Sequence, residues 1–156
     1  MIPEKIEFIK NGFLPLLSGM EKEKIGKWGK MNAQQMVEHL TAMFKISSGK
    51  LMMPLVTPEE NLLKFKEFLM SEKEFRENTK APLQIVPEEP LPLRNESMQD
   101  AFQVLERSVQ EYFTFFNDDA EKKTLHPVFG ELNFAEWIQL HHKHVTHHLK
   151  QFRLIS

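Results

Sequence analysis

The sequence contains no cysteine. Disulfide bonds, thiolate metal ligands and cysteine nucleophiles are therefore excluded. An excess of charge of one sign is lacking too, because 20 basic and 22 acidic residues give a net charge of −2. A surface that binds nucleic acid normally shows as a basic excess or a basic stripe. We therefore expect no nucleic-acid partner.

Long hydrophobic runs are also lacking. No stretch approaches the roughly 20 apolar residues that span a bilayer. The N-terminal segment, MIPEKIEFIKNGF, places charges among its apolar residues and does not have the uninterrupted apolar core of a signal peptide. We therefore expect no membrane partner and a cytoplasmic location, which a cysteine-free chain also suits.

Apolar residues are plentiful, although they are scattered. They make up 41% of the 156 residues, which is enough to build one core without disulfides or a structural metal. The length fits a single domain covering residues 1–156. The histidines are distributed unevenly, since five of the seven lie between positions 141 and 148. This cluster is the first feature that points to chemistry.

Apolar spacing and capping residues predict an all-α protein. Predicted helices cover about residues 3–18, 33–48, 58–70, 97–116 and 133–152. Capping boxes begin the second of these (Asn32 with Gln35) and the last (Asn133 with Glu136). In the helix from 97 to 116, large apolar residues recur at steps of four and three, as a bundle seam requires: Met98, Phe102, Leu105, Val109, Tyr112 and Phe116.

The segments between these helices contain turn and helix-breaking residues. Thr57 and Pro58 are expected to cap the third helix, and Pro15 to kink or shorten the first. Four prolines between 79 and 94 exclude a regular helix and predict a long crossover. Residues 126–130 read as a turn, and the brief LQIV run at 83–86 is the only strand candidate. The predicted fold is thus a four-helix bundle with a long crossover and one subsidiary helix.

Histidines at helical spacing predict a metal site. On a helical wheel, His144 and His148 lie one turn apart within the apolar stripe of the last helix. Burying an imidazole nitrogen without a partner costs free energy, and a metal removes that cost because the i,i+4 spacing aims both rings at one point. His39, in the middle of an inward seam on the second helix, is the expected third ligand. Three neutral imidazoles suit zinc or nickel, and three protein ligands fit a catalytic site better than a closed structural one.

For the remaining histidines, the sequence is compatible with more than one role. His141 faces inward one turn earlier, and is either a catalytic group for proton transfer, a ligand, or a hydrogen-bonded wall residue. His142 and His147 are expected to be solvated or to lie beside the ligands. His126 is expected to form a turn, although its loop could reach the mouth of the site. Gln151 either hydrogen-bonds a ligand histidine or lies at the surface.

Two tryptophans and one glutamate are expected to have structural roles and not functional ones. Trp28 and Trp137 are expected to be core or dimer-interface aromatics rather than platforms for a substrate. Glu38 points away from the side of the helix that carries His39, so we do not expect it to bind the metal. No phosphate-binding glycine loop and no Glu-x-x-His pair of the di-iron type is present.

These motifs resemble a known superfamily. The HxxxHxxQ pattern at 144–151 is similar to the C-terminal motif of the DinB/YfiT-like metalloenzymes, and MVEHL around His39 resembles their second-helix histidine. WGKM at 28–31, HPVFG at 126–130 and residues 133–152 resemble one uncharacterised branch. The resemblance implies an up-down-down-up four-helix topology, a three-histidine metal site between helices, and a homodimer. Relatives in that superfamily include thiol-dependent transferases and a maleylpyruvate isomerase that uses a low-molecular-weight thiol.

Two classes of function remain open. The first is a metal-dependent enzyme, either a hydrolase or a thiol-dependent transferase, in which the metal activates a water molecule or a low-molecular-weight thiol toward a small-molecule substrate. The second is a non-catalytic module, either a metal-stabilised helical scaffold or a binder of small ligands. A closed coordination sphere favours the second class, and an open position at the metal favours the first.

Overall fold

A computed structural model describes residues 2–156. Within that range the α-helices are α1 (Ile2–Glu7), α2 (Leu14–Leu17), α3 (Ala33–Ser47), α4 (Leu62–Met70), α5 (Met98–Phe116) and α6 (Phe134–Gln151). A π-helical segment, η1 (Phe8–Gly12), joins α1 to α2, and a 3-10 turn, η2 (Glu59–Asn61), precedes α4. Two short strands, β1 (Thr124–His126) and β2 (Gly130–Leu132), pair antiparallel between α5 and α6.

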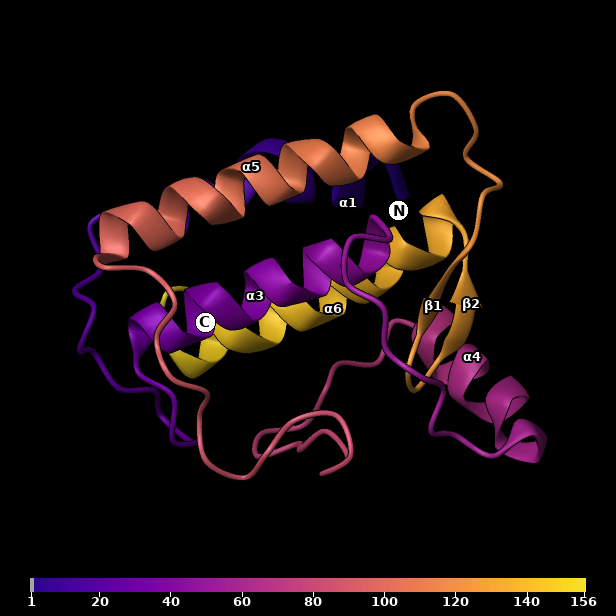
Figure 1. Ribbon diagram of the computed structural model, residues 1–156, viewed down its shortest axis with the longest axis horizontal. Helices are drawn as coiled ribbons and strands as arrows, with labels where there is room; N and C mark the ends of the chain where they lie inside the picture. The colour runs from indigo at the N-terminus through magenta and orange to yellow at the C-terminus, as the bar shows by residue number, and fades with distance from the viewer. Residues whose placement is uncertain (1) are drawn as a thin grey trace.

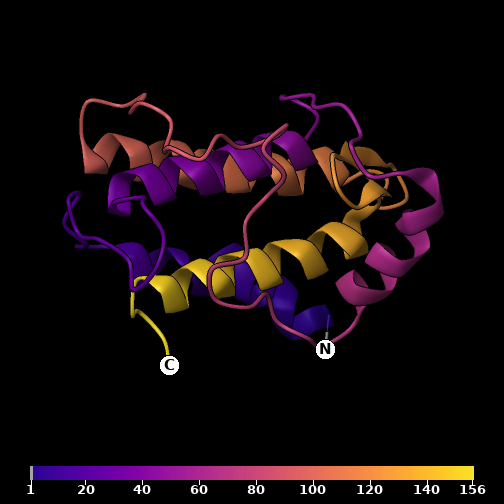
Figure 2. The same cartoon turned by 90° about the horizontal axis from the view of Figure 1, so that it is seen from below.

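The helices lie in two layers. Figure 2 shows α3 and α5 in one layer and α6 with the N-terminal helices in the other. The strand hairpin and α4 lie together at one end of these layers (Figure 1). A single core cluster runs from Ile9 to Phe152 between the layers, with Phe44 and Trp137 among its fully buried side chains. None of the helices in residues 2–156 combines the length and the apolar character needed to cross a membrane.

The predicted all-α fold class is wrong. The structure is a mixed α+β arrangement of six α-helices and a two-stranded antiparallel sheet, and not a pure four-helix bundle of up-down-down-up topology. The strands escaped notice because each is only three residues long, too short to show an alternating apolar pattern. The expected turn at 126–130 does exist, and the residues on either side of it pair as strands. The LQIV candidate at 83–86 forms a turn instead of a strand.

His126 stabilises the hairpin turn. Its Nδ1 accepts backbone N–H groups from Val128 at 2.9 Å and from Phe129 at 3.2 Å. The ring is therefore neutral, with its proton on Nε2, and burial lowers the pKa of His126 to about 3. Turn formation was the favoured of the two roles that the sequence left open, and these contacts confirm it.

His126 is expected to make the protein less stable in acid. Unfolded His126 takes up a proton near its ordinary pKa of 6.5, whereas the folded ring does so only near 3, so its stabilising effect is full above pH 6.5 and is lost as the pH falls toward 3. His126→Asn keeps a hydrogen-bond acceptor but removes the titration. The free energy of unfolding should then fall less steeply between about pH 5.5 and 4, by about 1.4 kcal/mol per pH unit. Urea unfolding across this range measures the two slopes, and equal slopes would contradict the assignment.

The helix predicted over 3–18 is interrupted. Phe13 N–H bonds Phe8 O at 3.0 Å, which closes the π-helical segment, and Pro15 then lies in the first turn of α2. Pro15 has no N–H to continue the helical ladder, so the chain must start a new helix at this point. The sequence predicts that Pro15 kinks or shortens the first helix, and the structure shows that helix interrupted just before it, at residues 8–13.

The other long helices follow the expected pattern. Both capping boxes form, with Asn32 and Gln35 at the start of α3 and Asn133 and Glu136 at the start of α6. The predicted seam of α5 faces the core, where Leu105 and Tyr112 are fully buried. Capping and periodicity depend on neighbours within four residues, which explains why these helices could be predicted.

The cap expected at Thr57 does not form. The Thr57 hydroxyl donates to Val128 O at 2.7 Å, so it ties the connection before η2 to the hairpin turn. Asn61 precedes α4, and its side chain makes no capping hydrogen bond. The Thr57 hydroxyl therefore bonds a carbonyl group that is distant in sequence, and not the backbone at the start of the helix as the sequence pattern predicted.

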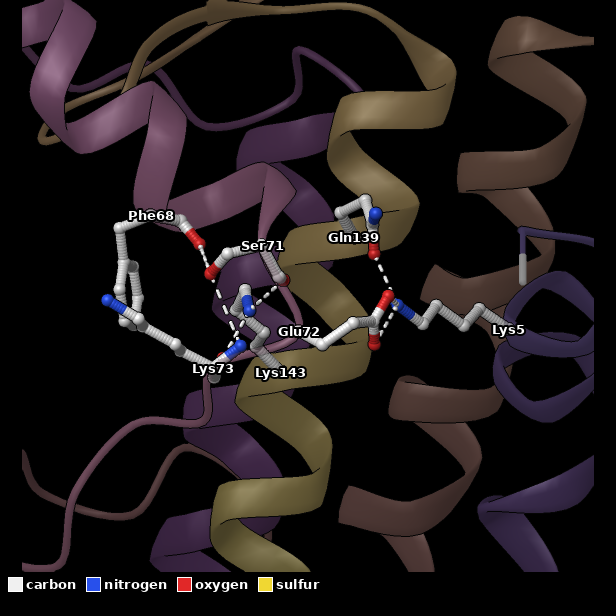
Figure 3. Close-up of polar contacts among 7 residues, drawn as sticks. All are labelled: Lys5, Phe68, Ser71, Glu72, Lys73, Gln139 and Lys143. Carbon is white, nitrogen blue, oxygen red and sulfur yellow. Dashed lines mark hydrogen bonds and ion pairs between the residues drawn. The ribbon is translucent and has the colours of Figure 1, made fainter.

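The first residues of the long crossover between α4 and α5 lie against α6, where Lys143 binds them (Figure 3). Lys143 Nζ donates to Ser71 O at 2.6 Å and to Lys73 O, and lies 5.0 Å from the centre of the Phe68 ring. Ser71 is the residue that ends α4, so the ammonium group satisfies carbonyl groups just beyond that helix. This contact docks the C-terminal end of α4 onto α6.

A second buried lysine ties the N-terminal helix to the same place. Lys5 Nζ donates to Gln139 Oε1 of α6 at 2.7 Å and to the Glu72 carboxylate at 3.0 Å (Figure 3). The ammonium group therefore has a partner on α6 and another on the crossover. Burying a lysine is costly unless it is paired in this way.

The crossover ends on α3, where Glu38 receives it. The Glu38 carboxylate, which is buried, accepts backbone N–H groups from Arg94 at 2.8 Å and from Asn95 at 3.1 Å. Burial alone would raise the pKa of Glu38, but these hydrogen bonds and those from the Asn95 and Gln34 amides together lower it. Glu38 is thus an anchor for the backbone, on the side of α3 that the sequence predicted.

Candidate metal centre

Three histidine side chains from two helices meet between α3 and α6. His144 Nε2 lies 2.9 Å from His39 Nε2 and 3.1 Å from His148 Nε2. One ligand nitrogen from each ring lies within 4.8 Å of the others. Two nitrogens bound to one ion at about 2.0–2.1 Å lie about 2.9–3.4 Å apart when the bond angle is about 90–110°. The two shortest spacings in the cluster therefore fit a shared ion.

Hydrogen bonds alone satisfy this cluster poorly. His144 Nδ1 is buried and has no hydrogen-bond partner within residues 2–156. The His144 ring therefore interacts with polar groups through Nε2 alone, and that atom faces two other imidazole nitrogens. One N–H can donate to only one of them, whereas a cation accepts all three lone pairs. The three histidines can thus hold a metal ion.

Gln151 sets the orientation and tautomer of His148. His148 Nδ1 lies 2.6 Å from Gln151 Oε1, and Gln151 Nε2 donates to Trp28 O at 2.8 Å. A backbone carbonyl only accepts, so the amide NH₂ must face Trp28 and the amide oxygen must face His148. His148 Nδ1 therefore carries the proton, and its Nε2 lone pair faces the other two histidines. Of the two roles considered for Gln151, the structure shows the hydrogen bond, here to the candidate ligand His148, and the side chain is buried.

A glycine-containing loop holds Gln151 in turn. A Cβ at Gly26 would lie 2.8 Å from Gln151 Cγ, and a Cβ at Gly29 would lie 2.8 Å from Gln151 Nε2. Lys27 N also donates to Gln151 O at 2.6 Å. Only a residue without a side chain lets the loop come this close, and Gly29 also has a φ of +80°. The sequence suggested a loop here but carried no signal that it packs against Gln151.

Burial keeps the three candidate ligands neutral. It lowers the pKa of His39 to about 4, with smaller contributions from His147 and Arg94. Burial, reinforced by the neighbouring histidines, holds the pKa values of His144 and His148 well below the ordinary 6.5. Neutral imidazoles have the free lone pairs that a metal requires. His39 and His144 keep part of their surface exposed, which leaves the cluster a path to solvent.

His141 lies apart from this cluster in an aromatic cage. It is fully buried, its Nε2 lies 2.9 Å from Ser47 Oγ, and its ring stacks on Phe44 with 3.9 Å between ring centres. Tyr112 and Trp137 contact its ring at 4.9 and 5.4 Å between centres. Burial lowers its pKa well below the ordinary value. These contacts describe the hydrogen-bonded wall residue, and a role for His141 in proton transfer stays a prediction.

The two remaining histidines of α6 differ from each other. His142 is half-buried and meets the edge of Phe8 at 5.4 Å between ring centres. His147 is buried between Trp28 at 5.2 Å and Phe75 at 6.0 Å, and its ring centre lies 5.1 Å from that of His148. His147 therefore lies beside a candidate ligand, which is one of the two roles considered for it, and it is not solvated.

The two tryptophans differ in burial. Trp137 is fully buried and donates from Nε1 to Thr124 Oγ1 at 2.7 Å, so the core interpretation is confirmed. Trp28 is half-buried, and its ring lies against His147 next to the candidate ligand His148. Trp28 is therefore not part of the buried core, and it lies beside the candidate metal centre.

The fold and the site together define a mainly helical α+β protein with a three-histidine cluster that can hold a metal ion. Residues 15–154 match the model of a family described as a protein of unknown function (DUF1569), and the chain belongs to that family. All three histidines lie within the matched range. Comparison with curated proteins and with solved structures finds no match.

Proposed function

We propose that this protein is a metal-dependent enzyme whose zinc or nickel ion is bound by His39, His144 and His148. The convergence of three imidazole Nε2 atoms from two helices carries this proposal. Imidazole suits both metals, and an all-histidine set without carboxylate ligands disfavours magnesium and calcium. A metal in such a site supplies Lewis-acid chemistry, because it lowers the pKa of a water molecule or thiol that reaches it.

Two features support an enzyme over a metal-stabilised scaffold. Within the part of the chain that the structure describes, the ligand group has three members, and structural zinc sites normally have four protein ligands. His39 and His144 are also partly exposed, so a small molecule has access to the cluster. Both features fit a site that keeps a position for water, thiol or substrate.

The protein's own side chains prepare the site in two ways. Burial of the three rings keeps them unprotonated near neutral pH, so no proton has to leave before a metal is bound. Gln151 holds the proton of His148 on Nδ1 and thereby aims Nε2 inward. Histidines that bind a metal through one ring nitrogen usually donate the N–H of the other nitrogen to such an acceptor.

A hydrolase and a thiol-dependent transferase both remain within this proposal. The resemblance of the HxxxHxxQ segment to the DinB/YfiT-like metalloenzymes favours a low-molecular-weight thiol as the co-substrate. The same resemblance supports a homodimer, which sedimentation velocity at micromolar concentration checks. A cytoplasmic location fits the cysteine-free sequence.

Elemental analysis of protein purified without a histidine tag tests the site. Close to one zinc or nickel ion per chain is expected in the wild type, and none in His144→Ala, because His144 Nε2 lies closest to both other ligands. Cobalt-loaded protein then tests the open position, since added azide changes the visible spectrum only when the anion can reach the metal. Wild-type protein that is free of metal and refuses added zinc and nickel would remove the enzyme proposal.

A further inference from the structure

A groove of about 910 Å³ lies at the C-terminal end of α6, beside the metal centre. Its walls come from the loop at 27–28, from the crossover at 74–77, and from the end of α6 with the residues that follow it. The volume is in the range of small-molecule sites, which is about 300–1,000 Å³. His147 is part of the wall, and its ring touches that of His148. His147 therefore lies between the groove and the candidate ligand His148.

The groove offers apolar, planar surfaces. Trp28 and Phe75 lie on either side of His147, with ring centres 5.2 and 6.0 Å from it. Leu154 and Ile155 add aliphatic surface to the same groove. These side chains suit the flat or apolar body of a ligand, since aromatic faces provide much contact area.

In the part of the chain that the structure describes, two arginines that line the groove make no ion pair, although the C-terminal Ser156 lies in the same lining. Lys27 pairs with Glu77 at 3.7 Å, and Lys150 pairs with Glu74 at 2.6 Å. Arg76 also lines the groove, as does Arg153, and neither has an ion pair within residues 2–156. A guanidinium group binds a carboxylate with two parallel hydrogen bonds. The groove therefore presents cationic forks beside an apolar surface.

Arg153 occupies a backbone position that normally favours glycine. It follows the C-cap of α6 with a φ of 59°, and its N–H bonds Lys150 O while Leu154 N–H bonds Leu149 O. This is the Schellman arrangement, in which the left-handed residue is usually glycine because a Cβ costs free energy there. Arg153 thus places a long cationic side chain at the edge of the groove, at a position where glycine is usual.

We propose that this groove binds a small carboxylate with an apolar, planar body, and that Arg76 and Arg153 bind the carboxylate group. The ligand body lies against Trp28, Phe75 and His147, next to the metal centre. The identification of this ligand as a substrate of the metal centre rests on the function proposed above. The binding itself needs only the groove.

Isothermal titration calorimetry tests the groove by measuring the dissociation constants of 2-naphthoate and of its neutral analogue 2-naphthamide. Metal-free wild-type protein is expected to bind naphthoate at least tenfold more tightly than naphthamide. Arg153→Gly and Arg76→Ala should each weaken naphthoate binding about tenfold and leave naphthamide binding unchanged. Arg107→Ala removes an exposed arginine of α5 that does not line the groove, and should change neither affinity.

The melting temperature separates binding from folding. Arg153→Gly is expected to keep or raise it, because glycine relieves the left-handed position, so weaker binding cannot come from a damaged fold. Equal affinity for naphthoate and naphthamide, or full naphthoate affinity in both arginine variants, would overturn the proposal. If wild-type protein binds naphthoate but does not take up added zinc, the groove proposal is supported and the metal-centre proposal is refuted. Zinc uptake without naphthoate binding would do the reverse.

Discussion

Replacing His148 by alanine is expected to weaken zinc binding by about 100- to 1,000-fold. Structural sites with four ligands bind zinc with about 10–16 kcal/mol, or about 2.5–4 kcal/mol per ligand, and 1.4 kcal/mol is a factor of ten. His148 Nε2 lies 3.1 Å from His144 Nε2, and its lone pair faces the centre. Competition with a chromophoric zinc chelator measures the dissociation constant in both proteins.

His142→Ala is the matched control for that measurement. His142 belongs to the same helix, is half-buried, and packs its ring against Phe8, outside the cluster. Its removal should leave the zinc dissociation constant within a factor of two or so of wild type, since no ligand is lost. Equal zinc affinity in His148→Ala and His142→Ala would show that zinc does not bind at the three-histidine cluster.

Replacing Gln151 by methionine is expected to lower zinc affinity about 10- to 100-fold, the usual effect of losing the partner of a ligand histidine. Methionine matches the length of glutamine but offers His148 Nδ1–H only a weak sulfur acceptor, so the ring is free to rotate and change tautomer. The same chelator competition measures the affinity, and long-range ¹H–¹⁵N spectra report which nitrogen of His148 carries the proton. Wild-type affinity together with an unchanged tautomer would contradict this role.

Two glycine variants test whether the loop acts through Gln151. Gly29 and Gly19 both have a φ of +80°, so alanine strains the backbone equally at either position. Only at Gly29 would the new Cβ meet Gln151, whereas at Gly19 nothing lies within 4 Å. Gly29→Ala should therefore weaken zinc binding in the same direction as Gln151→Met, and Gly19→Ala should not. Equal zinc affinities in the two alanine variants would leave the loop without this function.

The candidate ligands could be found from the sequence because helical geometry is local. His144 and His148 are four residues apart, and both lie in α6, which begins at the predicted capping box. His39 required one further step, which was to match two inward faces on different helices. That step succeeded because each face is marked by apolar neighbours such as Met36 and Val145, both fully buried.

The groove next to the site could not be predicted. Its walls combine Trp28, Phe75 and His147, which are far apart in the sequence and are brought together by the loop held on Gln151 and by the crossover. The crossover itself is positioned by Lys143 at its start and Glu38 at its end. Charged residues are normally expected on the surface, and nothing in the local pattern marks these two as buried.

The sequence by itself determined α3, α5 and α6, their caps, and the inward direction of His39, His144 and His148 on their helices, because each depends on spacings of three or four residues. Only the tertiary structure decided that β1 and β2 pair, that Gln151 bonds His148 and Trp28, and that His141 points into an aromatic cage. Each of these depends on a partner that the folded chain must bring into contact. A short strand or a lone polar side chain has several possible partners, and the energy of packing the whole core selects among them.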